Sequence, residues 1–244
     1  MDRFDILIQK LNEAVPGLEL REHEPMSRHT SFRIGGPARL MALPAGRKEA
    51  VAAVRAAREL GLAPFFLGNG SDLLVSDQGF DGFVLKTTGL DQTRVVDRRL
   101  RAESGIFLAR LAMAAWGRGL TGLEFAHGIP GTLGGGVTMN AGAYGGELVQ
   151  VLTAVTFLNE AGKVVTLPVE ECQLTYRHSL FTDHPEWLIL EAEFELAQGG
   201  PSLSKIRMDE LAQQRRAKQP LDIPSAGSTF KRPEGHFAAA LIEQ

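Results

Sequence analysis

Two short motifs in the second half of the chain carry side chains suited to chemistry on an anionic substrate. The first, YRHS, places Arg177 directly after Tyr176 and follows a predicted hairpin. A guanidinium presents a planar pair of donors to a carboxylate or a developing enolate, a role that lysine fills less well. A surface arginine in an ion pair is the alternative interpretation, and the four residues alone leave both open.

The second motif, SAGSTFKRP (225–233), combines Ser228 with the basic pair Lys231 and Arg232. It is not the G-x-S-x-G elbow of a nucleophilic serine, and no nearby histidine is plainly its base. Three further cations precede it, namely Arg215, Arg216 and Lys218. In an acidic protein, such a cluster indicates either a solvated basic face or a site for a diphosphate-bearing ligand.

Two glycine-rich segments are suited to holding a ligand against the main chain. LGNGSDLLV (67–75) is a predicted strand that ends in a turn with N–H donors for a phosphate, although it lacks a dinucleotide fingerprint and a P-loop lysine. An ordinary tight turn is the alternative. The stretch 122–147 holds nine of the 27 glycines, interleaved with apolar residues that a solvated linker would not carry. We predict a buried, ligand-lining coil with many bare N–H groups there, in which residues 134–136 form no regular helix.

Composition narrows the class of protein. The chain has 244 residues, 44% of them hydrophobic and 23% charged, and a net charge of −3, which argues against a general nucleic-acid or anionic-membrane binder. Cys172 is the single cysteine and the six histidines are scattered, so neither a disulfide nor a metal site is expected. The amphipathic N-terminus is neither a signal peptide nor a membrane span. We therefore expect a cytoplasmic protein.

The elements that must position these motifs fall into three predicted segments, 1–88, 89–198 and 199–244. In the first, Asp2 caps a helix, and strands at 39–43, 64–67 and 83–85 surround an alanine-rich helix at 47–60. This order is typical of an α/β unit. In the second, the pattern predicts the following elements: one exposed edge strand within 94–102, a helix capped by Ser104, a hairpin around 159–162 and a strand at 187–196. In the third, a basic helix at 204–218 and a last helix from about 236 follow a boundary at 198–201.

Taken together, the residues of these motifs and their order along the chain indicate a family more specifically than any single motif does. The succession TSFRIGGPA (30–38), LGNGSDLLV, the glycine stretch 122–147, YRHS and KQPLDIPSAGSTFKRP (218–233) resembles the UDP-N-acetylenolpyruvoylglucosamine reductase family over nearly the whole chain. The resemblance implies an α+β fold with a two-lobed FAD-binding domain of the vanillyl-alcohol-oxidase type, and an incomplete C-terminal α/β domain for the substrate. It also implies non-covalent FAD, NADPH as hydride donor and a UDP-sugar enolpyruvyl ether as substrate in peptidoglycan precursor synthesis.

The resemblance assigns roles to individual residues. Arg177 would stabilise the enolate formed by hydride transfer, and Ser228 would donate the proton that completes reduction. Substrate contacts are expected from Tyr176, Lys218, Lys231 and Arg232. FAD contacts are expected from Arg33, Gly68, Asn69, Gly70, Ser71, Gly128, Ile129, Pro130, Gly131, Gly135, Asn140, Gly142 and Tyr144.

One departure from the family pattern concerns the end of the sequence. The family continues some tens of residues past Leu241-Ile242-Glu243-Gln244, and a glutamate there completes the catalytic set, so we expect a C-terminally truncated chain. Two alternatives follow. The chain is a flavin-binding module without turnover, or it is another flavoenzyme of the same fold, which SAGSTFKRP and YRHS argue against. The sequence leaves the oligomeric state open.

Overall fold

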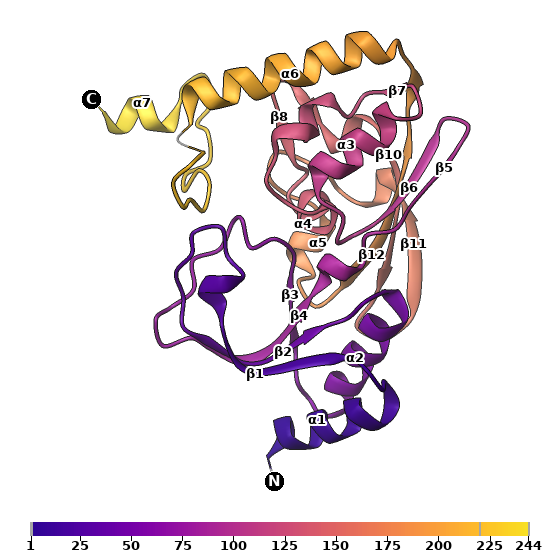
Figure 1. The fold of residues 1–244 in the computed structure, drawn as a ribbon, viewed down its shortest axis with the longest axis vertical. Helices are drawn as coiled ribbons and strands as arrows, with labels where there is room; N and C mark the ends of the chain where they lie inside the picture. Colours follow the sequence, from indigo (N-terminus) through magenta and orange to yellow (C-terminus); the bar gives the residue numbers. More distant parts are fainter. Residues whose placement is uncertain (1, 220, 244) are drawn as a thin grey trace.

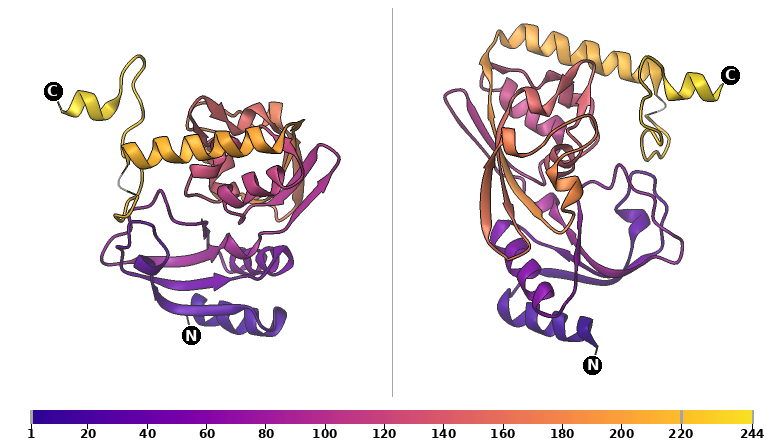
Figure 2. Two further views of the ribbon diagram at one scale, coloured as in Figure 1. Left: turned by 45° about the horizontal axis from the view of Figure 1, so that its top comes forward. Right: turned by 180° about the vertical axis from the view of Figure 1, so that it is seen from behind.

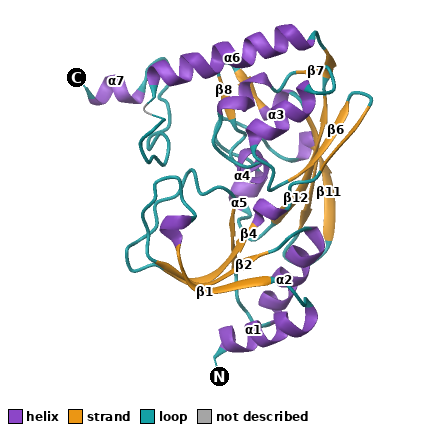
Figure 3. Cartoon of the chain, viewed as in Figure 1, coloured by secondary structure: helices purple, strands orange, loops and turns teal. Residues whose placement is uncertain are grey.

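The computed structural model describes residues 2–219 and 221–243, and it consists of two lobes with a long helix across one end. A four-stranded sheet forms the lobe near the N-terminus, and a five-stranded sheet forms the other (Figures 1 and 3). The long helix, α6 (Pro201–Lys218), lies over the far end of the second lobe. Among the described residues, no helix combines the length and apolar composition that a membrane crossing requires.

The first lobe is a mixed sheet with the strand order β1-β2-β4-β3. Its strands are β1 (Glu19–Pro25), β2 (Pro37–Leu43), β3 (Pro64–Leu67) and β4 (Phe80–Lys86). Only β1 runs antiparallel to its neighbour, and β4 is parallel to both β2 and β3. Two helices complete the core, α1 (Arg3–Ala14) and α2 (Arg47–Glu59). The Asp2 carboxylate accepts the N–H groups of Phe4 and Asp5, as its predicted capping role requires.

The second lobe is an antiparallel sheet with the order β11-β10-β12-β6-β5. Its strands are β5 (Thr93–Val96), β6 (Arg99–Glu103), β10 (Leu152–Leu158), β11 (Val164–Pro168) and β12 (Leu188–Glu195). Buried and half-buried residues alternate from Leu190 to Glu195 of β12, which matches the period of two in that part of its sequence. The predicted hairpin is formed by β10 and β11, where the Asn159 side chain accepts the N–H of Lys163.

Short elements connect the two sheets and cover them. The remaining α-helices are α3 (Leu108–Trp116), α4 (Leu133–Thr138), α5 (Leu180–Asp183) and α7 (Ala238–Ile242), of which α7 lies at the C-terminal end and buries no residue. The 3₁₀ turns are η1 (Met26–Arg28), η2 (Thr87–Gly89), η3 (Glu124–Gly128), η4 (Leu148–Gln150) and η5 (Val169–Glu171). Two strand pairs are minimal, β7 (Leu120–Thr121) with β13 (Ala197–Gln198) and β8 (Gly142–Ala143) with β9 (Gly146–Glu147).

The prediction of one exposed edge strand within 94–102 is wrong. The chain turns at Asp97, whose φ is +53°, and forms two paired strands. Only β5 lies at the edge, whereas β6 pairs with β12 on its other side and buries Leu100 and Ala102. Aspartate tolerates the left-handed region, so a short turn interrupts what otherwise reads as one alternating run.

The predicted cap of α3 by Ser104 is also wrong. The helix begins at Leu108, with Phe107 as its N-cap residue and without a side-chain cap. Ser104 instead follows β6, and its N–H donates to the carbonyl of Leu190 at 3.0 Å. Its hydroxyl is buried and has no hydrogen-bond partner among the described residues. A strand contact therefore overrides the local capping preference of serine.

The glycine stretch contains a helix that its composition argued against. Residues 133–138, including all three consecutive glycines, form α4, so the prediction of a coil there is wrong. The N–H groups of Leu133 and Gly134 donate to the carbonyls of Ile106 and Ser104, and so they are not bare donors for a ligand. Glycine is unfavourable in a helix by about 1 kcal/mol per residue, and here tertiary contacts outweigh that cost.

The C-terminal part of the chain leaves the second lobe and returns towards the first. Met208 and Leu211 of α6 are buried against the second lobe. Beyond α6, the segment that contains residues 221–237 descends from the helix towards loops of the first lobe (Figures 1 and 2). Each sheet lies on one side of the boundary predicted near residue 88, but the proposed three-segment division itself stays a prediction.

Candidate functional site

Two loops from different lobes contact each other. The side chain of Asn69, which follows β3, donates from Nδ2 to the carbonyl of Pro130 at 2.6 Å. A Cβ placed on Gly68 would lie 2.1 Å from Oγ1 of Thr132, so only glycine permits this approach. Residues 68–71 and 128–131, both predicted to contact the ligand, are therefore brought together by the fold, with Thr132 beside them.

The conformation of the first loop depends on Gly70. Its φ is +62°, and a Cβ there would lie 2.2 Å from the carbonyl oxygen of His29. The same turn of the first lobe reinforces the contact, because the N–H of Ser31 donates to the carbonyl of Gly70 at 3.1 Å. The positive φ and the close approach both require glycine at this position.

A buried ionisable pair, Glu24 and His29, lies next to this loop. Nε2 of His29 lies 2.8 Å from Oε1 of Glu24, and both side chains are buried. Burial lowers the pKa of His29, against the effect of Glu24, while the hydrogen bond from His29 and the contact with Arg21 lower the pKa of Glu24. Burial also lowers the pKa of Lys86, at the end of β4. A neutral imidazole that donates to an ionised carboxylate fits these directions.

The glycines of the stretch 122–147 are of two kinds. Some are required by protein packing, because an added Cβ would lie 2.7 Å from Glu147 at Gly142 and 2.5 Å from the ring of Phe125 at Gly146. Three others have more space. The nearest atoms to an added Cβ lie at 3.4 Å for Gly128, 3.6 Å for Gly131 and 4.0 Å for Gly135. Protein packing therefore leaves glycine unexplained at these three positions, and a flat ligand lying against the backbone fits them.

Asn140 braces the site from within the protein. It is 1% exposed, and Nδ2 donates to Glu147 at 3.1 Å and to the carbonyl of Thr175 at 3.2 Å. Its Oδ1 accepts the N–H of Val149 at 3.1 Å. The side chain thus joins the glycine stretch to Thr175, the residue before YRHS, and its hydrogen-bonding groups are occupied by protein.

Arg177 is placed over the glycine stretch. Its Nη2 donates to the carbonyl of Gly142 at 3.2 Å, and its guanidinium lies 5.3 Å from the centre of the Tyr176 ring. The backbone adopts a φ of +55° at Arg177, inside a tight turn closed by the paired residues Thr175 and His178. Arg177 forms no ion pair with any described residue, so the ion-pair interpretation of YRHS is not supported.

The SAGSTFKRP segment reaches both lobes. At the first lobe, Ser225 hydrogen-bonds to Ser31, and the space beside Gly227 ends at the carbonyl of Ser71, 3.8 Å from an added Cβ. At the second, the N–H of Arg232 donates to the Tyr176 hydroxyl at 3.2 Å. The segment therefore brings Ser228 to the side of the two loops, where its side chain is exposed.

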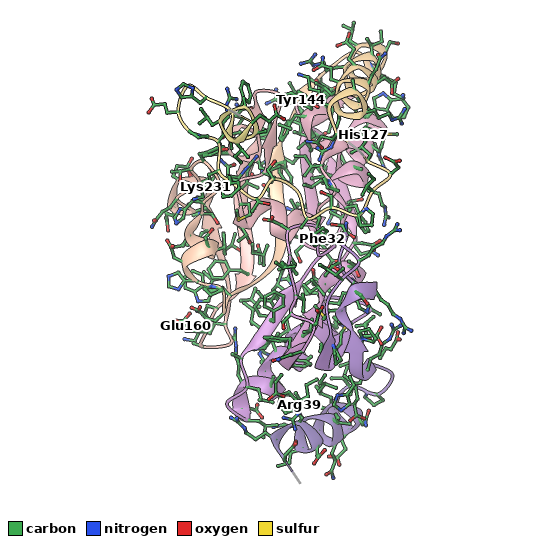
Figure 4. All side chains as sticks on the ribbon, turned by 90° about the vertical axis from the view of Figure 1, so that its left-hand side faces the viewer. Phe32, Arg39, His127, Tyr144, Glu160 and Lys231 are labelled. Carbon is green, nitrogen blue, oxygen red and sulfur yellow. The ribbon has the colours of Figure 1, made fainter. Side chains whose placement is uncertain are left out.

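The other predicted site residues are spread around this region. Tyr144 is 40% exposed and has a φ of +55°, and Arg33 is exposed with a φ of +57°. Lys218 and Lys231 are exposed and form no ion pair with a described residue. Lys231 and Tyr144 lie in the same half of the molecule, at the opposite end from Arg39 (Figure 4). The fold thus gathers most predicted site residues, but the two lysines are not tied to the loops.

Arg215 is a candidate that sequence analysis treated only as one of a basic cluster. Unlike Arg216 and Lys218, it is half-buried, and its Cδ lies 3.4 Å from a Cβ placed on Gly128. Burial lowers its pKa, and among the described residues no carboxylate is paired with it. It follows the buried Met208 and Leu211 at helical spacing, which is the signal that distinguishes it from its neighbours.

Metal chemistry has no evident support in this region. Within residues 2–219 and 221–243, no three His, Cys, Asp or Glu side chains are grouped so as to hold a metal ion. Cys172 is buried, and burial raises its pKa to about 11, so it is a poor nucleophile. The groups that remain are backbone amides, an arginine over the glycine stretch and a serine on an exposed segment that is hydrogen-bonded to both lobes, a set suited to binding an anionic flat ligand and moving a proton.

Comparisons with known proteins agree with this geometry. A family model described as an FAD binding domain matches residues 38–168. A UDP-N-acetylenolpyruvoylglucosamine reductase from Caldanaerobacter subterraneus subsp. tengcongensis is 45% identical over 98% of this chain and 79% of its own length. One from Clostridium novyi is 43% identical over 96% of this chain and 76% of its own length. The crystal structure of the Thermus caldophilus reductase superposes with a TM-score of 0.77 at 30% identity, covering 93% of this chain and 79% of that one.

Proposed function

This chain belongs to the UDP-N-acetylenolpyruvoylglucosamine reductase family, and from that premise we propose that its two glycine loops hold FAD and that NADPH is the hydride donor. The family reduces the enolpyruvyl group of UDP-N-acetylglucosamine enolpyruvate to give UDP-N-acetylmuramate for peptidoglycan synthesis, on an α+β, FAD-binding fold. The observation that carries the proposal is the joining of residues 68–71 to residues 128–132 beside glycines that protein packing does not require.

The protein's part in flavin binding would fall to backbone groups of both loops. Gly68, Asn69, Gly70 and Ser71 would face the diphosphate, and Gly128, Ile129, Pro130, Gly131, Gly135 and Tyr144 would line the flavin. FAD, when bound, supplies the hydride-transfer chemistry. Asn140 and Gly142 would act by holding the glycine stretch and Arg177 in place, since their polar groups already contact protein.

Arg177 would stabilise negative charge that develops on the substrate. Hydride addition to the terminal alkene carbon leaves an enolate conjugated with the substrate carboxylate. A fixed guanidinium with no ionic partner in the described protein is suited to that charge, and such a group contributes on the order of 3 kcal/mol to transition-state stabilisation. Its hydrogen bond to Gly142 sets its position before the substrate arrives.

Ser228 would complete the reduction by donating a proton to the adjacent carbon. An alcohol is a weak acid, so this step depends on a basic enolate and on a fixed geometry. The position of Gly227 beside Ser71 supports this role, because it holds the preceding residue against the predicted FAD loop.

The substrate diphosphate would be bound by cations on α6 and on the segment beyond it. We assign Lys218, Lys231 and Arg232 to it, together with Tyr176, whose hydroxyl accepts the N–H of Arg232. Arg215 we assign to a phosphate of a ligand lying on the glycine stretch, because a desolvated guanidinium without an ionic partner is costly unless an anion completes it. A UDP-sugar partner supports a cytoplasmic location and, through peptidoglycan synthesis, a role in cell shape and division.

Flavin binding without turnover is a second candidate function. The observation that favours it is the exposure of Ser228, Lys218 and Lys231, which contact little of the described chain. The two glycine loops would then bind FAD, while Ser228, Lys218 and Lys231 would not be held in a productive position.

The two candidates separate in one set of measurements. Purified protein is desalted and its flavin absorbance recorded, and NADPH oxidation is then followed with and without the enolpyruvyl sugar. The reductase predicts substrate-dependent oxidation that falls about 100-fold or more in Arg177→Ala and in Ser228→Ala. Arg94→Ala, on the edge strand β5, serves as the control with unchanged activity. Retained flavin with only slow, substrate-independent oxidation supports the binding module, and a colourless protein that cannot be reconstituted contradicts both.

A further inference from the structure

Ser31 lies at a junction between the predicted FAD loop and the segment that carries Ser228. Its N–H donates to the carbonyl of Gly70 at 3.1 Å. Its hydroxyl donates to the carbonyl of Ser225 at 2.6 Å, and its own carbonyl accepts the N–H of Ser225 at 3.2 Å. Two polar groups of Ser31 therefore bind a residue 194 positions away in the sequence, and the third binds loop 68–71.

The junction is rigid on one side and weakly held on the other. On the first-lobe side, Gly70 packs against the backbone of His29 and Thr30, and the Thr30 hydroxyl donates to the carbonyl of Ile34 at 3.1 Å. On the other side, the Ser225 hydroxyl accepts the N–H of Gly227, and Ser228 follows directly. Among the described residues, Ser31 and Tyr176 are the points where hydrogen bonds attach 221–237 to the two lobes.

We propose that Ser31 is a positioning residue that couples ligand binding at loop 68–71 to the placement of Ser228. This inference rests on the proposed function. Any shift of Gly70 that a bound diphosphate imposes or prevents passes to Ser31 through its N–H, and from Ser31 to Ser225 through two hydrogen bonds. FAD in the loop then holds the segment, and the held segment strengthens FAD binding by the same factor, because coupling between two sites is reciprocal.

Limited trypsin digestion tests the first half of this coupling without relying on activity. Lys218 and Lys231 are exposed, so they offer cleavage sites beside and on the segment, whereas the bond after Arg232 precedes Pro233 and resists trypsin. In the wild-type chain, saturating FAD is expected to slow cleavage at Lys231 about fivefold, the factor that one net hydrogen bond supplies. Ser31→Ala should lose this protection. Ser31→Thr, which keeps the hydroxyl, should retain it, as should the control Ser27→Ala.

Flavin fluorescence titration tests the second half. Ser31→Ala is expected to raise the Kd for FAD by the same factor, about fivefold, by which it abolishes protection. The loss of a direct contact between Ser31 and FAD would also weaken binding in Ser31→Ala. Ser225→Pro, which removes the other N–H of the junction, is therefore measured alone and combined with Ser31→Ala. Two changes that act through one junction should be non-additive.

The outcomes are distinguishable. FAD that binds tightly to the wild-type chain without protecting Lys231, or that protects it equally in Ser31→Ala, overturns the coupling and leaves the proposed function standing. Additive effects of Ser31→Ala and Ser225→Pro on the Kd overturn it as well. A wild-type chain that does not bind FAD at all overturns the proposed function and the coupling together.

Discussion

The loop 68–71 and the segment 221–237 both border the predicted flavin site, but they are held in different ways. The loop is fixed by contacts so close that Gly68 and Gly70 tolerate no Cβ. The segment is exposed along almost its whole length and is attached by hydrogen bonds at Ser31 and Tyr176. Folding therefore builds the binding surface, whereas the residue proposed for proton transfer sits on a part of the chain with little stability of its own.

This difference determines which of the two regions opens at the lower free-energy cost. Regions with few buried contacts open at a low free-energy cost, and ligand-dependent steps draw on such regions. Exposed apolar side chains on the segment, including Leu221, Ile223 and Phe230, bury little surface against the two lobes. The comparison predicts that substitutions in the loop act on global stability and flavin content, and that substitutions in the segment leave global stability unchanged and alter FAD binding only where they break the Ser31 junction.

Gly70→Ala is expected to have the largest effect. A left-handed φ of +62° costs an alanine about 1 kcal/mol, and the contact at 2.2 Å with the His29 carbonyl forces the backbone to move as well. We expect a loss of about 3 kcal/mol in the free energy of unfolding, a fall of about 9 °C in Tm, and loss of flavin absorbance.

Gly145→Ala is the matched control for Gly70→Ala. Its φ is +84°, but nothing lies within 4 Å of an added Cβ, so only conformational strain is introduced. A decrease in Tm of about 3 °C is expected. Equal losses in the two variants would show that close packing against His29 does not matter.

Asn140→Ala should have the next largest effect, because it removes the brace between the glycine stretch and YRHS. Three hydrogen bonds are lost in a buried place, and the Val149 N–H and Thr175 carbonyl are left without this partner. The expected cost is about 2 kcal/mol in the free energy of unfolding, measured by urea denaturation. Asn159→Ala, in the exposed hairpin, loses one hydrogen bond and should cost about 1 kcal/mol or less. Similar values for the two would contradict a bracing role.

Sequence patterns predicted the elements whose causes are local. The Asp2 cap, the alanine-rich helix α2 and the Asn159 hairpin follow from side chains within a few residues of each other, and all three are present. Helix α4 and the uncapped start of α3 were missed because their causes are distant. Gly136 is needed where Leu108 and Leu148 approach it, and Ser104 is committed to Leu190.

The site was likewise predictable only in part. The sequence motifs identified the two loops, YRHS and SAGSTFKRP, and their likeness to known reductases is confirmed at the level of the family. It did not separate glycines that face open space from glycines that pack against Glu147 or Phe125. It also did not reveal Ser31 as a junction, since the partner, Ser225, lies far away in the sequence. Residue roles at the site stay predictions.

Acidification should destabilise the region around loop 68–71 more than the segment 221–237. Because the folded pKa of His29 lies below its ordinary value of 6.5, the unfolded chain takes up the proton first, and stability falls as pH drops below 6.5. Glu24 has a folded pKa below 4.5, so its contribution is present above pH 4.5 and is lost at lower pH. We expect Tm to fall between pH 7 and pH 5, with a smaller fall in His29→Gln, which keeps a donor for Glu24 but does not titrate.

The control for acidification is His236→Gln, in the exposed part of the C-terminal segment. It should leave the pH dependence of Tm unchanged. An equal slope in wild type and His29→Gln would mean that the buried pair beneath Gly70 contributes nothing to this dependence.

Gly227→Ala should have the smallest effect, and it compares the two regions most directly. Gly227 and Gly70 both have a left-handed φ, +84° and +62°, so the same substitution introduces similar backbone strain. The surroundings differ, because the nearest atom to an added Cβ is the Ser71 carbonyl oxygen at 3.8 Å for Gly227 and the His29 carbonyl oxygen at 2.2 Å for Gly70. The segment relieves its strain by shifting in solvent, so we expect a Tm within about 1 °C of wild type and full flavin content. A fall in Tm as large as that of Gly70→Ala would mean that the segment is part of the cooperative core, and the contrast between a fixed loop and a weakly held segment would then be wrong.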